Sequence, residues 1–153
     1  MAIKMKAFVD MKMTGSSKSH ARTDISARDV TAIIDEPVAR GGTNLGLTPT
    51  ETLISALVSC TNVITNRLAH KLGAEVGSLE IAAVAKFDRR GATIEEEIDL
   101  PFPEIVLDIA ITTDATPAQM DQIKADLGRF CPIAKVIRAA GTDIVENWTV
   151  SAL

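Results

Sequence analysis

The residues best suited to chemistry are two cysteines, Cys60 and Cys131. Cys131 directly precedes Pro132, and proline is favoured at the first position of a helix. The sequence therefore predicts Cys131 as the N-cap of a short helix over 132–140. Unpaired N–H groups and the helix dipole favour an anion at that position, so we expect a lowered pKa for the Cys131 thiol. The alternative is a small cap residue without reactivity.

Cys60 lies inside a predicted long helix. Thr48 is a good N-cap, and Glu51 completes a capping box with it. Lys71 favours the last turn, and Gly73 predicts the stop. Cys60 is about three turns from the start, where the helix dipole has faded, so a reactive thiolate there needs a cation from another element. The alternative is a buried cysteine that packs as a small hydrophobic residue.

Glu51 is a poor acid–base partner for Cys60 within one helix. Nine residues at about 100° each place the two side chains on opposite sides, about 13 Å apart along the axis. Thr50 is nearer to Cys60 in angle but carries no charge. Capping of the helix already accounts for Glu51.

Other motifs give little support for a cofactor. His20 and His70 have neither each other nor the cysteines at a metal-ligand spacing. The segment GGTNLG matches neither the P-loop nor the dinucleotide-binding glycine pattern. We therefore expect no metal and no bound organic cofactor.

Composition limits the partners. The net charge of −4, the absence of Tyr and the single Trp argue against nucleic acid and an anionic membrane surface. No apolar run of about 18 residues is present, and the N-terminus lacks a signal-peptide pattern. Two cysteines are too few for a disulfide scaffold. These features favour a cytoplasmic protein with two free thiols.

The elements that must position the cysteines follow the order βββ–α–ββ–α–α–β. Strands and helices occur in groups, which predicts an α+β fold with an antiparallel sheet in one domain over 1–153. Apart from the two helices around the cysteines, the predicted segments are strands over 3–13, 20–26, 29–35, 78–88, 104–112 and 143–150, a turn over 14–19, and a helix from Pro117 that Thr116 and Gln119 cap.

Three motifs together resemble the OsmC/Ohr family of osmotically inducible and organic-hydroperoxide-resistance proteins. They are GGTNLGLTPTETLISALVSCTN around Cys60, FCPIAKVI around Cys131, and DEP shortly before the first glycines. The resemblance covers nearly the whole chain in the same order. It implies an intertwined homodimer with the two long helices at its centre and an active site at each subunit interface.

The resemblance also implies a mechanism. Cys60 corresponds to the peroxidatic cysteine, and Cys131 to the resolving cysteine that forms a disulfide with it. The activating arginine of the family lies in the N-terminal strands, where Arg22 is the first candidate for the cation, Arg28 the second and Lys18 the third. Cys60, Cys131, Arg22 and Glu51 are the predicted catalytic residues. The implied substrate is an organic hydroperoxide, the implied reductant an external dithiol, and the implied setting stress defence.

One departure leaves a second hypothesis open. Peroxidase members carry an acid that binds the arginine at the helix start, and Thr50 stands at that position here. The alternative is an OsmC-like protein without strong peroxidase activity, which binds a small apolar ligand at an interface lined by residues such as Leu57, Val63 and Ile64. A third hypothesis is that both cysteines are structural.

Overall fold

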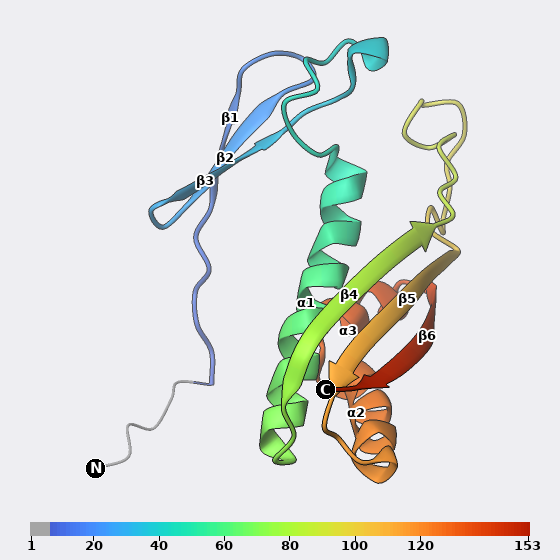
Figure 1. Ribbon diagram of the computed structural model, residues 1–153. Helices are drawn as coiled ribbons and strands as arrows, with labels where there is room; N and C mark the ends of the chain where they lie inside the picture. The colour runs from blue at the N-terminus through green and yellow to red at the C-terminus, as the bar shows by residue number, and fades with distance from the viewer. Residues whose placement is uncertain (1–6) are drawn as a thin grey trace. The chain divides into compact units, whose positions relative to one another are not determined.

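The computed structural model describes residues 7–153, which form two compact units divided between Leu53 and Ile54 (Figure 1). The first four residues of the predicted strand over 3–13 lie outside the described part of the chain. The α+β class is confirmed, since sheets and helices are segregated along the chain. The organisation as one domain over 1–153 stays a prediction.

The first unit contains a three-stranded antiparallel sheet. Its strands are β1 (Thr14–Ser17), β2 (Thr23–Ala27) and β3 (Val30–Ile34). Two predictions are wrong here, because residues 7–13 are not a strand and the predicted turn at 14–17 is β1. An alternating pattern forms a strand only where a neighbouring strand or a core receives it. Within the unit, the apolar side chains of this segment are exposed: Phe8, Val9, Met11 and Met13.

A tightly folded loop connects β3 to the long helix. It contains one 3₁₀ turn, η1 (Val38–Arg40), and a parallel bridge from Ile34 to Leu47. Two glycines are required by close backbone approach: a side chain at Gly42 would overlap the carbonyl of Glu36, and one at Gly46 would overlap that of Ile33. The glycines of GGTNLG therefore fold the loop onto β3.

The long helix α1 (Pro49–Lys71) begins and ends as predicted. The backbone N–H of Thr48 donates to Glu51 Oε2 (2.8 Å), and the N–H of Glu51 donates to Thr48 Oγ1 (3.2 Å), which completes the capping box. At the other end Gly73 adopts φ +76°, and the N–H of Ala74 donates to the carbonyl of Ala69 (2.9 Å). This left-handed glycine stops the helix.

The second unit contains a mixed sheet in the order β4 (Val76–Ala85), β5 (Glu104–Thr113), β6 (Asp143–Ala152). β4 and β5 are antiparallel, but β6 runs parallel to β5, so the antiparallel prediction is wrong for this strand. The connection from β5 to β6 contains two helices, α2 (Pro117–Phe130) and α3 (Pro132–Ala139). A crossover of this length returns the chain to the start of β5.

The core of the second unit lies between this sheet and the helices, which cover one sheet face (Figure 1). Alternate residues of β5 point into it, as expected for a strand buried on one face. The fully buried members from strand and helices are Leu57, Ile105, Leu107, Ile109, Ile123 and Leu127. Alternate residues of β4 are half-buried against them: Leu79, Ile81, Ala83 and Ala85.

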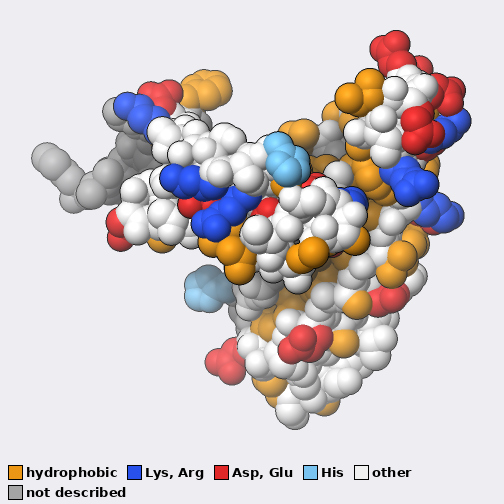
Figure 2. Space-filling model, turned by 90° about the horizontal axis from the view of Figure 1, so that it is seen from above, with side chains coloured by type: hydrophobic (Ala, Val, Ile, Leu, Met, Phe, Trp, Pro, Cys, Tyr) orange, Lys and Arg blue, Asp and Glu red, His pale blue; other side chains and the backbone are white. Residues whose placement is uncertain are grey.

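The segment 86–103 links β4 to β5 and is rich in charged residues. Phe87 and Phe102 stack with ring centroids 4.9 Å apart, and Arg90 pairs with Asp88 and Glu96. Figure 2 shows acidic side chains gathered at its upper right with basic ones beside them. The acidic run 95–97 is exposed.

Candidate active site

The structure brings the two cysteines into direct contact. Cys60, on α1, and Cys131, before α3, are free thiols whose Sγ atoms lie 2.9 Å apart. The Cys131 thiol donates a hydrogen bond to Cys60 Sγ. This pair is the candidate active site, and both of its members lie in the second unit.

Cys131 is held by the junction of two helices. It ends α2, where its N–H donates to the carbonyl of Leu127 (2.9 Å), and it caps α3. The N–H of Ala134 donates to Cys131 Sγ (3.4 Å), and Pro132 occupies the first helical position. The prediction of Cys131 as an N-cap is confirmed, and this cap geometry fixes where its sulfur points.

The predicted effect of that cap on the thiol is wrong. Burial raises the pKa of Cys131 to about 11, and the hydrogen bond to Cys60 adds to the rise. The N–H of Ala134 acts in the opposite direction but is outweighed. Cys131 is 0% exposed, so removal of its sulfur from water disfavours the thiolate more than one helix terminus favours it. Cys131 is therefore a protonated thiol at neutral pH.

Cys60 has a different environment. It is half-buried, at the edge of the hydrophobic core, whereas Cys131 is fully enclosed. Of the two sulfurs, Cys60 is therefore the one that a reagent from solvent reaches first. The interpretation of Cys60 as mere core filler does not account for its contact with a second thiol.

Polar contacts outside the pair hold the helix that carries Cys131. Arg138, on α3, donates to Glu146 Oε1 on β6 (3.1 Å) and to the carbonyl of Ile144 (3.4 Å). Its guanidinium covers Gly128, where any side chain would collide with it. At the start of α2, Gln119 donates to the carbonyl of Leu72 (2.9 Å), which fixes α2 against the end of α1.

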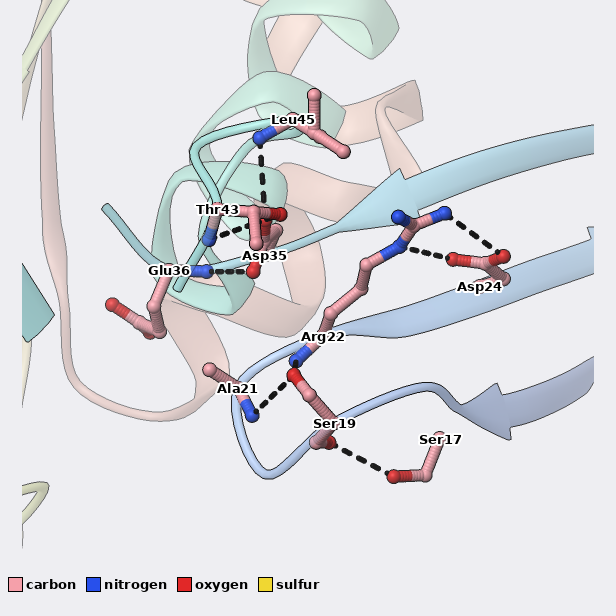
Figure 3. Close-up of polar contacts among 9 residues, drawn as sticks. All are labelled: Ser17, Ser19, Ala21, Arg22, Asp24, Asp35, Glu36, Thr43 and Leu45. Atoms are coloured by element: carbon pink, nitrogen blue, oxygen red, sulfur yellow. Dashed lines mark hydrogen bonds and ion pairs between the residues drawn. The ribbon is translucent and has the colours of Figure 1, made fainter. Parts of the chain in front are cut away.

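The other two predicted catalytic residues lie in the first unit. Arg22 Nε and Nη2 donate to the two carboxylate oxygens of Asp24 (2.8 and 3.2 Å), as Figure 3 shows. This hydrogen bonding raises the pKa of Arg22 and lowers that of Asp24. Arg28, the second candidate, lies in the exposed β2–β3 turn with φ 55°. The activation of Cys60 by either arginine stays a prediction.

Glu51 has the capping role found in its sequence pattern. The N–H of Thr48 lowers the pKa of its carboxyl, so Glu51 is a carboxylate at neutral pH. Thr50, the residue before Glu51, lies with its hydroxyl 3.1 Å from that of Thr48. The start of α1 is therefore occupied by mutually bonded hydroxyl and carboxylate groups.

Asp35 is a buried, hydrogen-bonded carboxylate that was not among the predicted site residues. Its buried carboxylate accepts hydrogen bonds from the N–H groups of Glu36 (2.9 Å), Thr43 (3.0 Å) and Leu45 (3.2 Å), and from the Thr43 hydroxyl (2.5 Å), as Figure 3 shows. The Thr43 hydroxyl contributes most to lowering the pKa of Asp35. The sequence feature that could have indicated this role is the position of Asp35 in DEP, at the end of a strand and before a glycine-rich loop.

The described residues give no other centre of this kind. Both histidines are exposed, and no three His, Cys, Asp or Glu side chains between residues 7 and 153 gather in a way that could hold a metal ion. Within the same residues, no helix combines the length and the hydropathy needed to cross a membrane.

Comparison with known proteins identifies the family. Residues 42–147 match the family described as OsmC-like protein, and this range includes both cysteines. No curated protein sequence matches the chain significantly.

Solved structures share the fold at low sequence identity. An OsmC-like protein from Mycoplasma pneumoniae is 15% identical, with a TM-score of 0.78 over 94% of this chain and 98% of its own. An organic hydroperoxide resistance protein from Legionella pneumophila is 13% identical, with a TM-score of 0.65 over 95% of this chain and 99% of its own.

The organic hydroperoxide resistance protein OhrB of Bacillus subtilis is 18% identical, with a TM-score of 0.60 over 92% of this chain and 98% of its own. The TM-scores establish a common fold. The match of the family to more than half of the chain establishes membership. The chain belongs to the OsmC-like protein family.

Proposed function

We propose that this protein is a thiol peroxidase that reduces organic hydroperoxides, of the fatty-acid or alkyl class, to alcohols. The single observation that carries the proposal is the contact between Cys60 Sγ and Cys131 Sγ at 2.9 Å. Two thiols this close, one reachable and one enclosed, are the arrangement that a peroxidatic and a resolving cysteine need.

The first chemical step takes place at Cys60. Its thiolate attacks one oxygen of the peroxide, the O–O bond breaks, and Cys60 becomes a sulfenic acid while the alcohol leaves with a proton from the medium. Sulfur is oxidised by two electrons, and the peroxide is reduced by two. Cys60 is assigned this step because it is the half-buried member of the pair.

The second step uses Cys131. Its sulfur attacks the Cys60 sulfenic acid, the S–O bond breaks, and water leaves with the thiol proton, so that a Cys60–Cys131 disulfide remains. An external dithiol then reduces this disulfide and restores both thiols. Capture within one chain stops the oxidation before the irreversible sulfinic stage.

Other parts of the proposal depend on the family resemblance. They are an intertwined homodimer with active sites at the subunit interface, a cytoplasmic location, and activation of Cys60 by Arg22 with Glu51 at the helix start. The names of the Legionella and Bacillus proteins connect them with organic hydroperoxide resistance, which supports the choice of substrate class. An apolar interface would favour organic peroxides over hydrogen peroxide.

The direct test is intact mass and free-thiol count on the reduced protein, before and after one equivalent of cumene hydroperoxide. We expect the loss of two hydrogens and of both thiols within seconds, within a single chain. Cys60→Ser should abolish peroxide consumption. With two or more equivalents of peroxide, Cys131→Ser should let Cys60 proceed to the sulfinic acid. Two thiols still free after minutes would contradict the proposal.

A second candidate function is binding of a small apolar ligand without strong peroxidase activity. Thr50 is the observation that favours it, since its hydroxyl contacts that of Thr48 where a peroxidase of this family has an acid. Thr50→Glu should raise the peroxidase rate if Arg22 is the activating cation. No increase, together with slow oxidation of the wild-type thiols, would favour ligand binding.

A further inference from the structure

The contact between the two sulfurs has a direction. Cys131 Sγ donates to Cys60 Sγ, and Cys131 in turn accepts from the N–H of Ala134 (3.4 Å). A thiol has one proton to give. The single donor of Cys131 is therefore committed to Cys60, while its acceptor capacity is used by the backbone of α3.

Burial keeps that donor in place. Cys131 is 0% exposed, and its pKa is raised to about 11, mainly because its sulfur is removed from water. It is therefore still protonated at a pH at which an ordinary cysteine has begun to ionise. A donor that keeps its proton can stabilise a negative charge on the acceptor across the whole physiological range.

The acceptor has the complementary setting. Cys60 is about three turns from the start of α1, beyond the first turn in which the helix dipole acts. A hydrogen bond to the charged form of an acid favours that form and lowers its pKa. In this partly apolar surrounding the hydrogen bond is stronger than in water.

We propose that Cys131 is a positioning residue for Cys60 before any peroxide arrives: its S–H group hydrogen-bonds to the Cys60 thiolate and stabilises it. The hydrogen bond is a second role for Cys131, beside that of resolving cysteine. Its effect on catalysis rests on the proposed function, but its effect on the Cys60 thiolate does not. The second unit thereby provides part of the activation of Cys60 from its own residues. The cap of α3 gives the donor its direction.

The test compares Cys131→Ala, which removes the donor, with Cys131→Ser, which keeps a hydroxyl donor at the same cap. Thiolate absorbance at 240 nm is followed as a function of pH in the reduced full chain, with Cys60→Ser as the blank for Cys131. We expect the midpoint for Cys60 to rise by about one pH unit in Cys131→Ala, a tenfold change in the ionisation constant. In Cys131→Ser the midpoint should return most of the way to the wild-type value.

Because Cys131 is buried, a substitution there could disturb folding, so a second measurement uses the native donor. The Raman S–H stretching band of Cys131 should lie at the lower frequency of a hydrogen-bonded thiol in the wild type. It should move to higher frequency in Cys60→Ala, where the acceptor is gone. An unchanged midpoint in Cys131→Ala, or an unshifted Raman band, would overturn the inference.

These outcomes separate the inference from the proposed function. If the midpoint rises but cumene hydroperoxide leaves the wild-type thiols intact, the hydrogen bond is real and the peroxidase proposal is wrong. If the wild type oxidises rapidly and the midpoint does not move, the peroxidase proposal stands. The activation of Cys60 must then come from elsewhere.

Discussion

The two units of this chain use polar groups in opposite ways. In the first unit, Asp35 is buried as a carboxylate because four donors from the loop surround it, and Arg22 is neutralised by Asp24. In the second unit, Cys131 is buried with the backbone N–H groups of Ile133 and Ala134 and one sulfur neighbour, and its uncharged form is favoured. Burial alone does not set ionisation, because the number of donors around a group decides which form is stable.

The largest expected effect comes from the apolar core that encloses the sulfur pair. Leu127 is 1% exposed and accepts the N–H of Cys131, so Leu127→Ala removes packing directly beneath the cap. We expect a loss of about 2–5 kcal/mol in the free energy of unfolding, measured by urea denaturation.

The matched control is Leu45→Ala in the loop of the first unit, where the same side chain is 58% exposed. It should change the free energy of unfolding by about 0.5 kcal/mol or less. Similar losses for both variants would contradict the contrast between a packed second unit and a hydrogen-bonded loop.

A second effect follows from the raised pKa of Cys131. In the unfolded chain this thiol ionises near 9.0, and in the folded chain near 11. Its contribution to stability is therefore complete below about pH 9 and is lost as the pH rises to 11. The full loss is about 2–3 kcal/mol, from two pKa units at about 1.4 kcal/mol each.

The measurement is urea denaturation of the wild type and of Cys131→Ser at pH 8, 9, 10 and 11, with a reductant and without oxygen. The other titrating groups are the same in both chains, so the difference between the two curves isolates the thiol. We expect the stability of the wild type to fall more steeply over this range. Parallel curves would show that Cys131 ionises as readily when folded as when unfolded.

The smallest effect on global stability is expected at Asp35. The pKa of this carboxyl is lowered in the folded state, so its contribution is present above the usual Asp range and is lost as the pH falls through its folded pKa. Asp35→Asn keeps the shape but replaces one acceptor by a donor that faces other donors. Limited proteolysis should then cut within residues 36–47 faster by about tenfold.

Asp29→Asn is the control, since Asp29 is exposed in the β2–β3 turn of the same unit. It should leave the cleavage rate unchanged. Lowering the pH should accelerate cleavage of the wild type toward the rate of Asp35→Asn. Equal protection of all three chains would mean that the loop does not depend on the Asp35 carboxylate.

Local signals in the sequence were sufficient for most of the helices and strands. Thr48 with Glu51, and Thr116 with Gln119, form the capping boxes that their spacing predicts, and Pro132 places α3. These motifs act within one turn of a helix, so neighbouring residues determine them. The segment 7–13 is the counterexample, because alternation shows that a strand is possible but does not supply its neighbour.

Contacts between residues far apart in the sequence could not be predicted from such local signals. The parallel direction of β6 depends on how α2 and α3 pack, and the acceptor role of Asp35 depends on a loop that returns to β3. The sequence pointed to both cysteines, but only through resemblance to a family did it pair them. No spacing rule connects residues that lie on separate helices.

The sequence by itself determined the helix starts, most strands, the α+β class and the family, because caps, periodicity and motifs are local properties of the chain. Only the tertiary structure decided the state of the sulfur pair. Cys131 occupies the cap that its sequence predicts, yet its pKa is raised, because the packing of α1, α2 and the sheet removes water from the sulfur. Desolvation depends on everything that surrounds an atom, and it outweighed a local dipole that could be predicted from two neighbouring residues.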